Sequence, residues 1–490
     1  MLILYNPPSS ARRKPVMPLS LLALGALLEG RHEYTIVDGN LDPSALQTID
    51  RLVREQGATM LAVTVMPGPQ LSDATPLCRE LKTRHPQLKI IWGGYFPTQH
   101  YDACLRSGYV DYVVRGHGEV VFQSLVDQVA AGEDPTSLNG LAYLAPNGIP
   151  TSNAMAPIPH PDSLPDFPYD RVDVLRYARK TFMGRRTLPH HSSYGCPFFC
   201  NFCAVVNMVG GRWMAQSAER TAGVARRLVT NYGADAVEFY DNNFFVHEAR
   251  TAEFAERIMD LGIAWWGEAR IDTLLRYSDR SWQLMRDAGL RMVFMGAESG
   301  SNETLKRMNK GGSASTEKTL AMAEHMRRFG IVPEFSFVLG NPPDPEADVH
   351  QTLAFIRQVK RVNPSTEIIM YVYTPVPLAG ELYDQAQAEG FQFPTTLDEW
   401  ISPEWSDFSQ RRSAQIPWLA DPIRRHLRDF ERVLSAYYPT ITNPDLRGFR
   451  RFALRATSAW RYHLGVYRYP YELRPLQRLL AYQRPETCGF

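Results

Sequence analysis

The stretch HSSYGCPFFCNFC, residues 191–203, places Cys196, Cys200 and Cys203 directly after a segment with strand character. Cysteines in C-x3-C-x2-C spacing can bind three irons of a 4Fe-4S cluster, whose usual complement is four cysteines. The fourth iron then stays open to a substrate ligand. The alternative is a structural zinc site of the Cys3His kind with His190 or His191 as fourth ligand, although zinc fingers usually show paired short spacings. The spacing favours the iron–sulfur cluster.

Segments with strand and helix character alternate from this stretch to about residue 380. Six strands are predicted, at 191–195, 236–242, 264–270, 291–297, 332–340 and 367–375. Five amphipathic helices are predicted between them, at 217–232, 248–261, 279–288, 316–329 and 346–361. Repeated strand–helix units predict a partial (β/α)6 barrel, in which functional residues gather at the carboxyl ends of the strands. The cysteines follow the first predicted strand, where that rule places a functional site.

The first 150 residues alternate in the same way. Five apolar segments, at 2–6, 34–38, 60–65, 89–94 and 111–116, are each followed by a helical stretch. Because parallel strands need crossover helices, this predicts a doubly wound parallel (Rossmann-like) sheet that binds its ligand at the carboxyl ends of the strands. Neither G-x-G-x-x-G nor a P-loop motif occurs, so the ligand is not predicted to be a dinucleotide or a nucleoside triphosphate. Gly93-Gly94 either admits a large ligand close to the backbone or only makes a tight turn.

The α/β chain is predicted to divide into four parts. APIPHPDSLPDFPYD, residues 156–170, has too many prolines for a helix or a central strand and predicts an extended linker. The predicted parts are the Rossmann-like domain at 1–150, the linker at 151–185, the barrel at 186–380 and a mainly helical region at 381–490. The last region, with Trp400, Trp405 and Trp418, is expected to close the open side of the barrel and shape a substrate pocket.

The composition of the 490 residues is that of an ordinary globular protein, with 44% hydrophobic and 21% charged residues and a formal net charge of +1. So small a charge gives no overall attraction to nucleic acid, and an anionic partner needs a local patch. The apolar run at 19–28 is too short to span a bilayer, and no secretory signal is recognised. Cys78, Cys104 and Cys488 are scattered, which predicts a reduced, cytoplasmic protein.

Residues 440–490 are locally basic, with nine arginines and three acids interleaved with aromatic residues. This pattern suits an anionic partner such as nucleic acid, lipid head groups or a propionate-bearing tetrapyrrole. A solvated face on a core-packed helix explains the same pattern and is the simpler interpretation. No nucleic acid partner is expected, and peripheral membrane contact through this segment is retained as a hypothesis.

The motif Cys196-x3-Cys200-x-Phe202-Cys203 resembles the defining motif of the radical S-adenosylmethionine superfamily, with Phe202 in the place of the aromatic residue that packs on the adenine. The resemblance implies S-adenosylmethionine binding by residues at successive strand ends, namely Phe202, Asp241, Asn242, Glu268, Arg270, Glu298, Ser299 and Gly340. Taken singly, Asp241 is equally a helix cap and Glu298 part of a turn. Arg270 fits independently, because a guanidinium pairs bidentately with a carboxylate such as that of methionine.

The Rossmann-like domain and linker before such a barrel resemble the cobalamin-binding class of this superfamily over about residues 1–380. The closest branch is the one with the anaerobic magnesium-protoporphyrin ester cyclase and several carbon methyltransferases. The resemblance implies cobalamin binding by Pro18, Leu19, Asp38, Thr64, Met66, Gly93, Gly94, Tyr95, Gly116 and Glu119. The D-x-H-x-x-G motif of histidine-ligated corrinoid modules is absent, so His32, His100 and His117 are expected to be surface or turn residues. The loop with Met66 is expected to face the lower side of the corrin without a strong axial ligand.

These resemblances imply an oxygen-sensitive enzyme with a 4Fe-4S cluster, S-adenosylmethionine and cobalamin. In the implied reaction a 5'-deoxyadenosyl radical takes hydrogen from an unactivated carbon, and methylcobalamin donates a methyl group. The expected substrate is a small molecule such as a natural product or lipid, and the expected electron donor is a flavodoxin or ferredoxin. One alternative is a cobalamin-dependent oxidation or cyclisation of a tetrapyrrole-like substrate without methyl transfer. The other is a non-catalytic corrinoid or iron–sulfur carrier or sensor.

Overall fold

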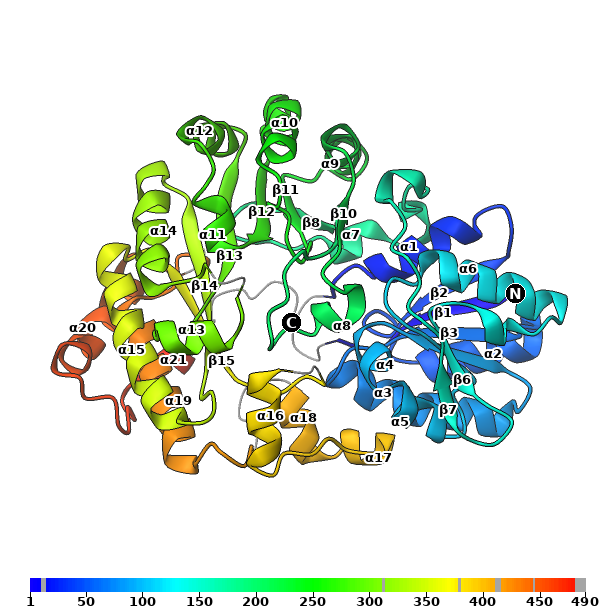
Figure 1. Ribbon diagram of the computed structural model, residues 1–490. Helices are drawn as coiled ribbons and strands as arrows, with labels where there is room; N and C mark the ends of the chain where they lie inside the picture. The colour runs from blue at the N-terminus through cyan, green and yellow to red at the C-terminus, as the bar shows by residue number, and fades with distance from the viewer. Residues whose placement is uncertain (10–14, 311–312, 378–379, 410–415, 444–445, 481–490) are drawn as a thin grey trace.

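The structure is a computed structural model that describes residues 1–9, 15–310, 313–377, 380–409, 416–443 and 446–480. Cys488 lies outside these ranges. Figure 1 shows two α/β units side by side, a smaller one in blue and cyan and a larger curved one in green and yellow, with the last helices in orange and red along the outer side of the larger unit.

The first unit contains a seven-stranded sheet with the order β2-β1-β3-β4-β5-β6-β7. Its parallel strands are β1 (Leu2–Asn6), β2 (Tyr34–Asp38), β3 (Met60–Thr64), β4 (Lys89–Gly93) and β5 (Tyr112–Val114). They confirm the predicted doubly wound sheet. An antiparallel pair, β6 (Leu141–Leu144) and β7 (Pro150–Ser152), extends the sheet beyond β5. The sequence interpretation missed this pair because each of its strands has at most four residues.

Helices cover both faces of this sheet, because successive side chains of a strand point to opposite sides. Leu2 and Leu4 of β1 pack with α1 (Leu19–Leu28) and α6 (Glu119–Ala131). Ile3 and Tyr5 pack on the other face with α2 (Ala45–Gln56), α3 (Pro69–Arg84) and α5 (Tyr101–Arg106). Burial on both faces explains why these strands are apolar throughout. Among the described helices, the apolar α1 included, none is long and apolar enough to cross a bilayer.

The Pro-rich segment is packed between the two units. Beyond β7 the chain runs through short turns and α7 (Val174–Tyr177), and both Tyr169 and Tyr177 are buried. The hydroxyl of Tyr177 donates to Asp38 of the first unit at 2.7 Å. The hydroxyl of Tyr169 lies 3.0 Å from Nδ1 of His190 in the second unit. The segment therefore contacts both units through buried hydrogen bonds.

The second unit is a curved sheet of six parallel strands with the order β15-β14-β13-β12-β11-β8. The strands are β8 (Thr187–His190), β11 (Ala236–Phe239), β12 (Ala264–Ala269), β13 (Leu290–Glu298), β14 (Val332–Leu339) and β15 (Glu367–Val372). The outer layer in Figure 1 consists of α9 (Ala218–Tyr232), α10 (Glu248–Ile258), α12 (Asp279–Asp287), α14 (Thr316–Phe329) and α15 (Pro345–Val362). This confirms the predicted partial (β/α)6 barrel.

The predicted first barrel strand at 191–195 is wrong in position. The barrel strand is β8, and Ser193–Gly195 is β9, which pairs antiparallel with β10 (Trp213–Ala215). The chain turns out of the barrel sheet after His190 because the backbone N–H of Ser192 donates to the Asp241 side chain at 2.6 Å. The cysteine loop therefore begins from a small hairpin beside the barrel.

The C-terminal region contacts both units. It contains α16 (Glu381–Ala388), α17 (Leu397–Trp400), α18 (Pro403–Ser409), α19 (Asp421–Tyr437), α20 (Gly448–Leu464) and α21 (Leu473–Leu479). The ring of Trp400 lies 5.1 Å from Phe96 and 4.6 Å from His100, both in the first unit. The indole N–H of Trp418 donates to the carbonyl of Gly340 at the end of β14, at 3.0 Å. Buried aromatic rings therefore link the barrel to the Rossmann-like unit.

Candidate functional site

The three cysteines lie on the loop between β9 and α8 (Val205–Val209). Cys200 is buried, and Cys196 and Cys203 are half-buried. Arg270 Nη1 donates to Cys200 Sγ at 3.4 Å, and Asn243 Nδ2 donates to Cys196 Sγ at 3.8 Å. Burial raises the pKa of the Cys196 and Cys200 thiols, while the charge of Arg270 acts in the opposite direction. The Cys196 and Cys200 sulfurs thus lie beside the hydrogen-bond donors Asn243 and Arg270, and the positive charge of Arg270 favours the thiolate form that binds iron.

The sulfur ligands of this loop fit an iron–sulfur cluster. In a cubane each thiolate binds a different iron, so the sulfurs need not converge. His190 is engaged elsewhere, since Nδ1 faces Tyr169 and Nε2 lies 3.2 Å from Gln216. The donor set fits a 4Fe-4S cluster held by Cys196, Cys200 and Cys203.

Asp241, at the end of β11, holds the hairpin that leads to the cysteines. Its fully buried carboxylate accepts the backbone N–H of Ser192 at 2.6 Å and the hydroxyls of Ser192 and Ser193 at 2.6 and 2.8 Å. Arg250 also donates to the Ser192 hydroxyl, at 2.9 Å. Asp241 therefore positions the start of the cysteine loop, while its predicted contact with S-adenosylmethionine stays a prediction.

Arg270, at the end of β12, has a carboxylate partner within the chain. Its Nε and Nη2 donate to the two oxygens of Asp272, each at 3.0 Å, and Nη2 also donates to the carbonyl of Lys310 at 2.8 Å. The guanidinium lies over the ring of Phe198 at 3.8 Å. To pair with the methionine carboxylate, Arg270 would have to bind a second carboxylate or release Asp272. The predicted pairing stays a prediction.

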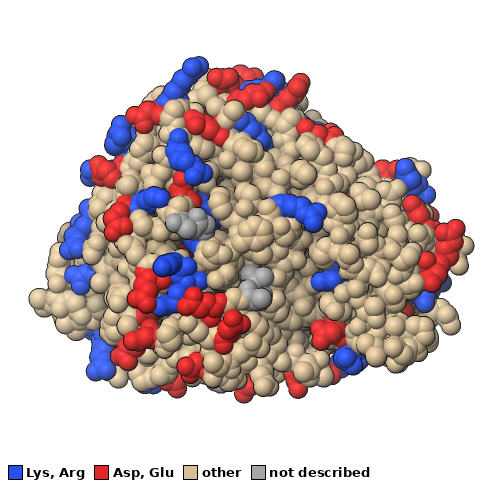
Figure 2. Space-filling model, in the orientation of Figure 1, with Lys and Arg blue, Asp and Glu red and all other residues tan. Residues whose placement is uncertain are grey.

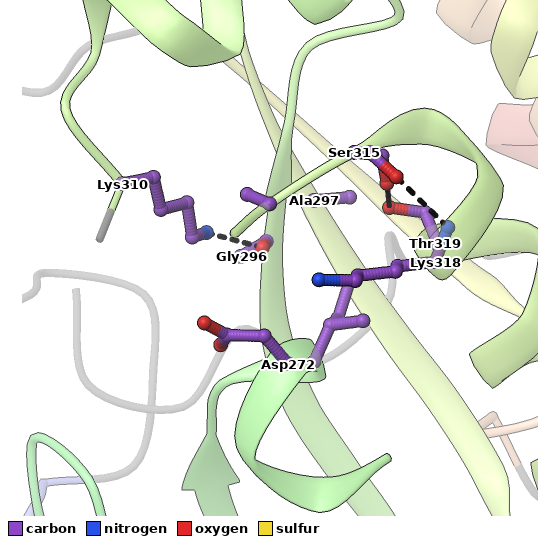
Figure 3. Close-up of a pocket in the computed structure, with 9 residues that line it drawn as sticks. Asp272, Gly296, Ala297, Lys310, Ser315, Lys318 and Thr319 are labelled. Atoms are coloured by element: carbon purple, nitrogen blue, oxygen red, sulfur yellow. Dashed lines mark hydrogen bonds between the residues drawn. The ribbon is translucent and has the colours of Figure 1, made fainter. Parts of the chain in front are cut away.

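A small pocket lies beside this ion pair, between the start of α11 (Ile271–Leu274), the end of β13 and the start of α14. Figure 3 shows Lys310, Lys318 and Asp272 around it, with Ser315 and Thr319 at the rim. Lys310 donates to Glu298 Oε1 at 2.5 Å and also to the carbonyl of Gly296. Sequence interpretation named Glu298 but missed Lys310 and Asp272, because neither belongs to a strand-end motif. Both are buried charged residues, and Asp272 pairs with Arg270 while Lys310 pairs with Glu298.

The carboxyl end of β14 is organised by Asp348 of α15. One oxygen of Asp348 accepts the backbone N–H of Gly340 at 2.9 Å, and the other accepts the Ser299 hydroxyl at 3.2 Å. Gly340 has a φ of 77°, which disfavours other residues. The structure therefore brings Ser299 and Gly340 together, as their predicted common ligand requires.

Phe202 and Asn242, two other residues predicted to bind S-adenosylmethionine, differ in how far their side chains are buried. Phe202 is half-buried and packs at the edge of the core, whereas the side chain of Asn242 is exposed. The buried amide beside Cys196 is that of the next residue, Asn243, whose Oδ1 has no hydrogen-bond partner among the described residues. Asn243 is thus the better candidate of these two amides for contact with a bound group.

Glu268, inside the barrel on β12, gives a pH dependence that can be measured. Burial and the neighbouring carboxylate of Asp241 raise its pKa from 4.5 to about 8. The folded protein therefore keeps a proton on Glu268 that the unfolded chain has released, and the contribution of Glu268 to the free energy of unfolding should fall as the pH rises from about 5 to about 8. Thermal unfolding of the cofactor-free wild type and of Glu268→Gln across this range measures this contribution as the difference between the two proteins. A difference that does not change with pH would contradict the assignment.

The predicted cobalamin residues gather at the carboxyl edge of the first sheet. The Ser20 hydroxyl of α1 lies 3.4 Å from Thr64 at the end of β3. Gly94, with a φ of 101°, lies so close to this strand end that a Cβ would be 3.2 Å from the Val65 carbonyl. The edge carries the residues named from the sequence, Pro18, Leu19, Thr64, Met66, Gly93, Gly94, Tyr95, Gly116 and Glu119.

Two predicted cobalamin residues, Asp38 and Glu119, differ in whether their carboxylate oxygens already have hydrogen-bond partners within the protein. The carboxylate of Asp38 accepts from Asn6 at 3.0 Å, from the Asn40 backbone at 2.9 Å and from Tyr177, so it organises the protein itself. Glu119 is buried at the start of α6, and its Oε2 has no partner in the part of the chain that the structure describes. An orphaned buried oxygen at a strand-end edge fits a ligand rich in amide donors, as corrinoids are.

The histidines of the first unit are engaged by the protein. His32 Nε2 lies 2.6 Å from Asp127, and His117 stacks on Tyr194 at 4.5 Å. His100 packs against Phe96 and Trp400, and burial lowers its pKa to about 3. All three are half-buried, and the expectation that none of them is a cobalt ligand stays a prediction.

The two predicted cofactor regions meet at one seam. Helix α4 (Tyr95–Gln99), directly after the Gly93-Gly94 turn, contacts α8, directly after Cys203. Nδ2 of Asn207 in α8 lies 3.4 Å from Gln99 Oε1 of α4 and 3.0 Å from the carbonyl of Pro377 after β15. At Gly116 a Cβ would lie 3.1 Å from the carbonyl of Met208 in α8. The cysteine loop therefore packs against the ligand edge of the first sheet.

Two protein families match the chain, in the order of its two α/β units. The family described as "B12 binding domain" matches residues 11–126, and the family described as "Radical SAM superfamily" matches residues 191–356. They confirm the predicted cofactors, which are cobalamin, a 4Fe-4S cluster and S-adenosylmethionine.

Similar proteins support the same assignment. An uncharacterized methyltransferase of Pyrococcus horikoshii is 25% identical over 73% of this chain and 78% of its own length. The anaerobic magnesium-protoporphyrin IX monomethyl ester cyclase of a Synechocystis species is 27% identical over 65% of this chain and 64% of its own length.

A solved structure shows the same fold. That of the radical S-adenosylmethionine methyltransferase TsrM from Kitasatospora setae, with cobalamin and a 4Fe-4S cluster bound, has a TM-score of 0.63 and 17% identity, covering 79% of this chain and 78% of that chain. The two family matches, a B12 binding domain followed by a radical S-adenosylmethionine domain, identify the chain as a cobalamin-binding radical S-adenosylmethionine enzyme.

Proposed function

We propose that the protein methylates an unactivated carbon of a small-molecule substrate, from the class of natural products or lipids. The contact of α4 with α8 supports this proposal, because α4 belongs to the edge predicted to bind cobalamin and α8 follows the cysteine loop. Methyl transfer to a carbon requires the methyl donor and the activated carbon to be held in contact. A substrate bound at the seam would lie between the two cofactor regions.

The residues of the chain bind and orient the reacting groups. When bound, the cluster with S-adenosylmethionine supplies hydrogen abstraction and cobalamin supplies a methyl group. Cys196, Cys200 and Cys203 would hold three irons, and Arg270 beside Cys200 offsets their negative charge. Asp241 fixes the hairpin from which the loop starts.

The test is a labelling experiment with anaerobically reconstituted enzyme. The enzyme, a strong reductant and S-adenosylmethionine with a deuterated methyl group are incubated with a small-molecule extract, and products carrying the label are sought by mass spectrometry. Labelled products together with 5'-deoxyadenosine are expected. Unlabelled products that have lost hydrogen would favour oxidation or cyclisation, which the 27% identity to the cyclase also favours. Absence of 5'-deoxyadenosine would favour a carrier or sensor.

Replacement of Gly94 by valine should remove cobalamin and leave the cluster intact. A Cβ at this position would lie 3.2 Å from the Val65 carbonyl and 3.3 Å from Thr64 Oγ1, and the φ of 101° excludes a β-branched residue without rearrangement. The turn would shift into the ligand edge, and cobalamin retained after desalting should fall at least about tenfold, a loss of about 1.4 kcal/mol in binding or more. Gly57→Val is the matched control. Gly57 also has a positive φ, of 66°, but a Cβ there meets open space.

The electron donor is proposed to be a flavodoxin or ferredoxin, since cleavage of S-adenosylmethionine consumes one electron from outside the chain.

A further inference from the structure

Helix α20 has two apolar faces, and only one of them is covered. Leu454 and Tyr462 are buried, on the side that packs against α19. On the opposite side, Phe449, Phe452 and Leu464 are 81%, 66% and 73% exposed. An amphipathic helix of a globular protein normally exposes polar residues on this side.

The exposed side chains form one stripe along the helix. Phe449, Phe452, Ala456, Trp460 and Leu464 follow the spacing i, i+3, i+7, i+11 and i+15, which places them on one face. At 1.5 Å per residue the stripe is about 22 Å long. Scattered exposed apolar residues are ordinary, but an aligned set of this length marks an interaction surface.

Basic residues are numerous in the segment that contains this stripe. Residues 446–480 contain eight arginines and a single acid, Glu472. Glu472 is paired with Arg461, so the other seven arginines have no acidic partner within this segment. Arg447 and Arg450 lie at the exposed start of α20. In Figure 2 uncharged and basic residues share the left edge, where Figure 1 shows α20.

We propose that the stripe Phe449–Leu464 of α20 binds the surface of an anionic membrane, with the helix lying parallel to the bilayer plane. Phenylalanine, tryptophan and leucine on one face, flanked by arginine, are the side chains that interfacial helices insert and pair with lipid phosphates. Leu479 of α21 is also an exposed apolar residue of the C-terminal helices, at 82%. The positive charge of this segment selects an anionic lipid surface over a neutral protein face as the occupant.

The experiment is co-sedimentation of the full chain with sucrose-loaded vesicles, made either of phosphatidylcholine alone or of phosphatidylcholine and phosphatidylglycerol at about three to one. Wild-type protein should bind the anionic vesicles at least about tenfold more tightly than the neutral ones, and this preference should fall as salt is raised. Phe449→Ser combined with Phe452→Ser should weaken binding at least about tenfold, because each inserted side chain contributes on the order of tenfold. Arg447→Glu combined with Arg450→Glu should remove the preference for anionic lipid.

The matched control is Ile149→Ser combined with Leu175→Ser, since these apolar residues are 55% and 54% exposed but lie outside the C-terminal helices. This variant should bind vesicles as the wild type does. Equal binding by the Phe449 and Phe452 variant would overturn the proposal. So would dimers in light scattering that depend on these two residues without vesicle binding, because the stripe would then be a contact between two copies. Vesicle binding is measured without turnover, so it succeeds or fails independently of the proposed methyl transfer.

Discussion

Cys200→Ala should lose its iron–sulfur cluster and form no 5'-deoxyadenosine above the level of a protein-free control. Cys200 is the buried cysteine of the three, and its sulfur accepts from Arg270 at 3.4 Å. Alanine removes a ligand to one iron and leaves a guanidinium beside a methyl group. Iron analysis of anaerobically reconstituted protein should give about four irons for the wild type and almost none for the variant.

The control for this prediction is Cys104→Ala. Cys104 is buried in the first unit, in the core between β4, α3 and α5, and has no role at the cysteine loop. This variant should keep its iron. Cys200→Ala should retain cobalamin, because the predicted cobalamin edge belongs to the other unit. Four irons and full 5'-deoxyadenosine formation in Cys200→Ala would exclude this cysteine as a cluster ligand.

Asp241→Ala should lower the free energy of unfolding by on the order of 3 kcal/mol and reduce the iron content as well. The buried carboxylate accepts three hydrogen bonds from Ser192 and Ser193, and its loss leaves a buried N–H and two hydroxyls without their acceptor. Because these serines start the hairpin of the cysteines, the loop should lose its fixed position. Urea unfolding of the cofactor-free protein measures the first effect, and iron analysis measures the second.

Asn242→Ala is the matched control, because Asn242 is the exposed neighbour of Asp241. It should change the free energy of unfolding by less than about 0.5 kcal/mol. Asp241→Asn should fall between the wild type and Asp241→Ala, since an amide oxygen is a weaker acceptor than a carboxylate. If Asp241→Ala kept wild-type stability and iron, the positioning role would be wrong.

The helices of the barrel could be predicted closely from the sequence. The predicted helices at 217–232 and 316–329 correspond to Ala218–Tyr232 and Thr316–Phe329. Their boundaries are local: Ser217 and Ser315 cap the first turns, and Gly233 and Gly330 end the helices in the left-handed conformation. Apolar periodicity and capping residues both lie within or next to the helix itself, and the helix can therefore be predicted from the local sequence.

The start of the barrel could not be predicted in this way. Both 187–190 and 193–195 have strand character, and the sequence alone does not distinguish a barrel strand from a hairpin strand. The choice depends on Asp241, about fifty residues further on, which takes the N–H of Ser192. A hydrogen bond between residues so far apart leaves no local pattern.

The sequence by itself determined the two α/β units and the cysteine spacing that favours a 4Fe-4S cluster, because strand–helix periodicity and ligand spacing are properties of neighbouring residues. S-adenosylmethionine and cobalamin followed from the resemblance of these motifs to a known family. Only the tertiary structure decided how these parts meet. It placed α8 against α4, gave Arg270 the partner Asp272, brought Lys310 to Glu298 and left one apolar face of α20 uncovered. The physical reason is that charge pairing and burial depend on distances between segments, which are fixed only when the whole chain packs.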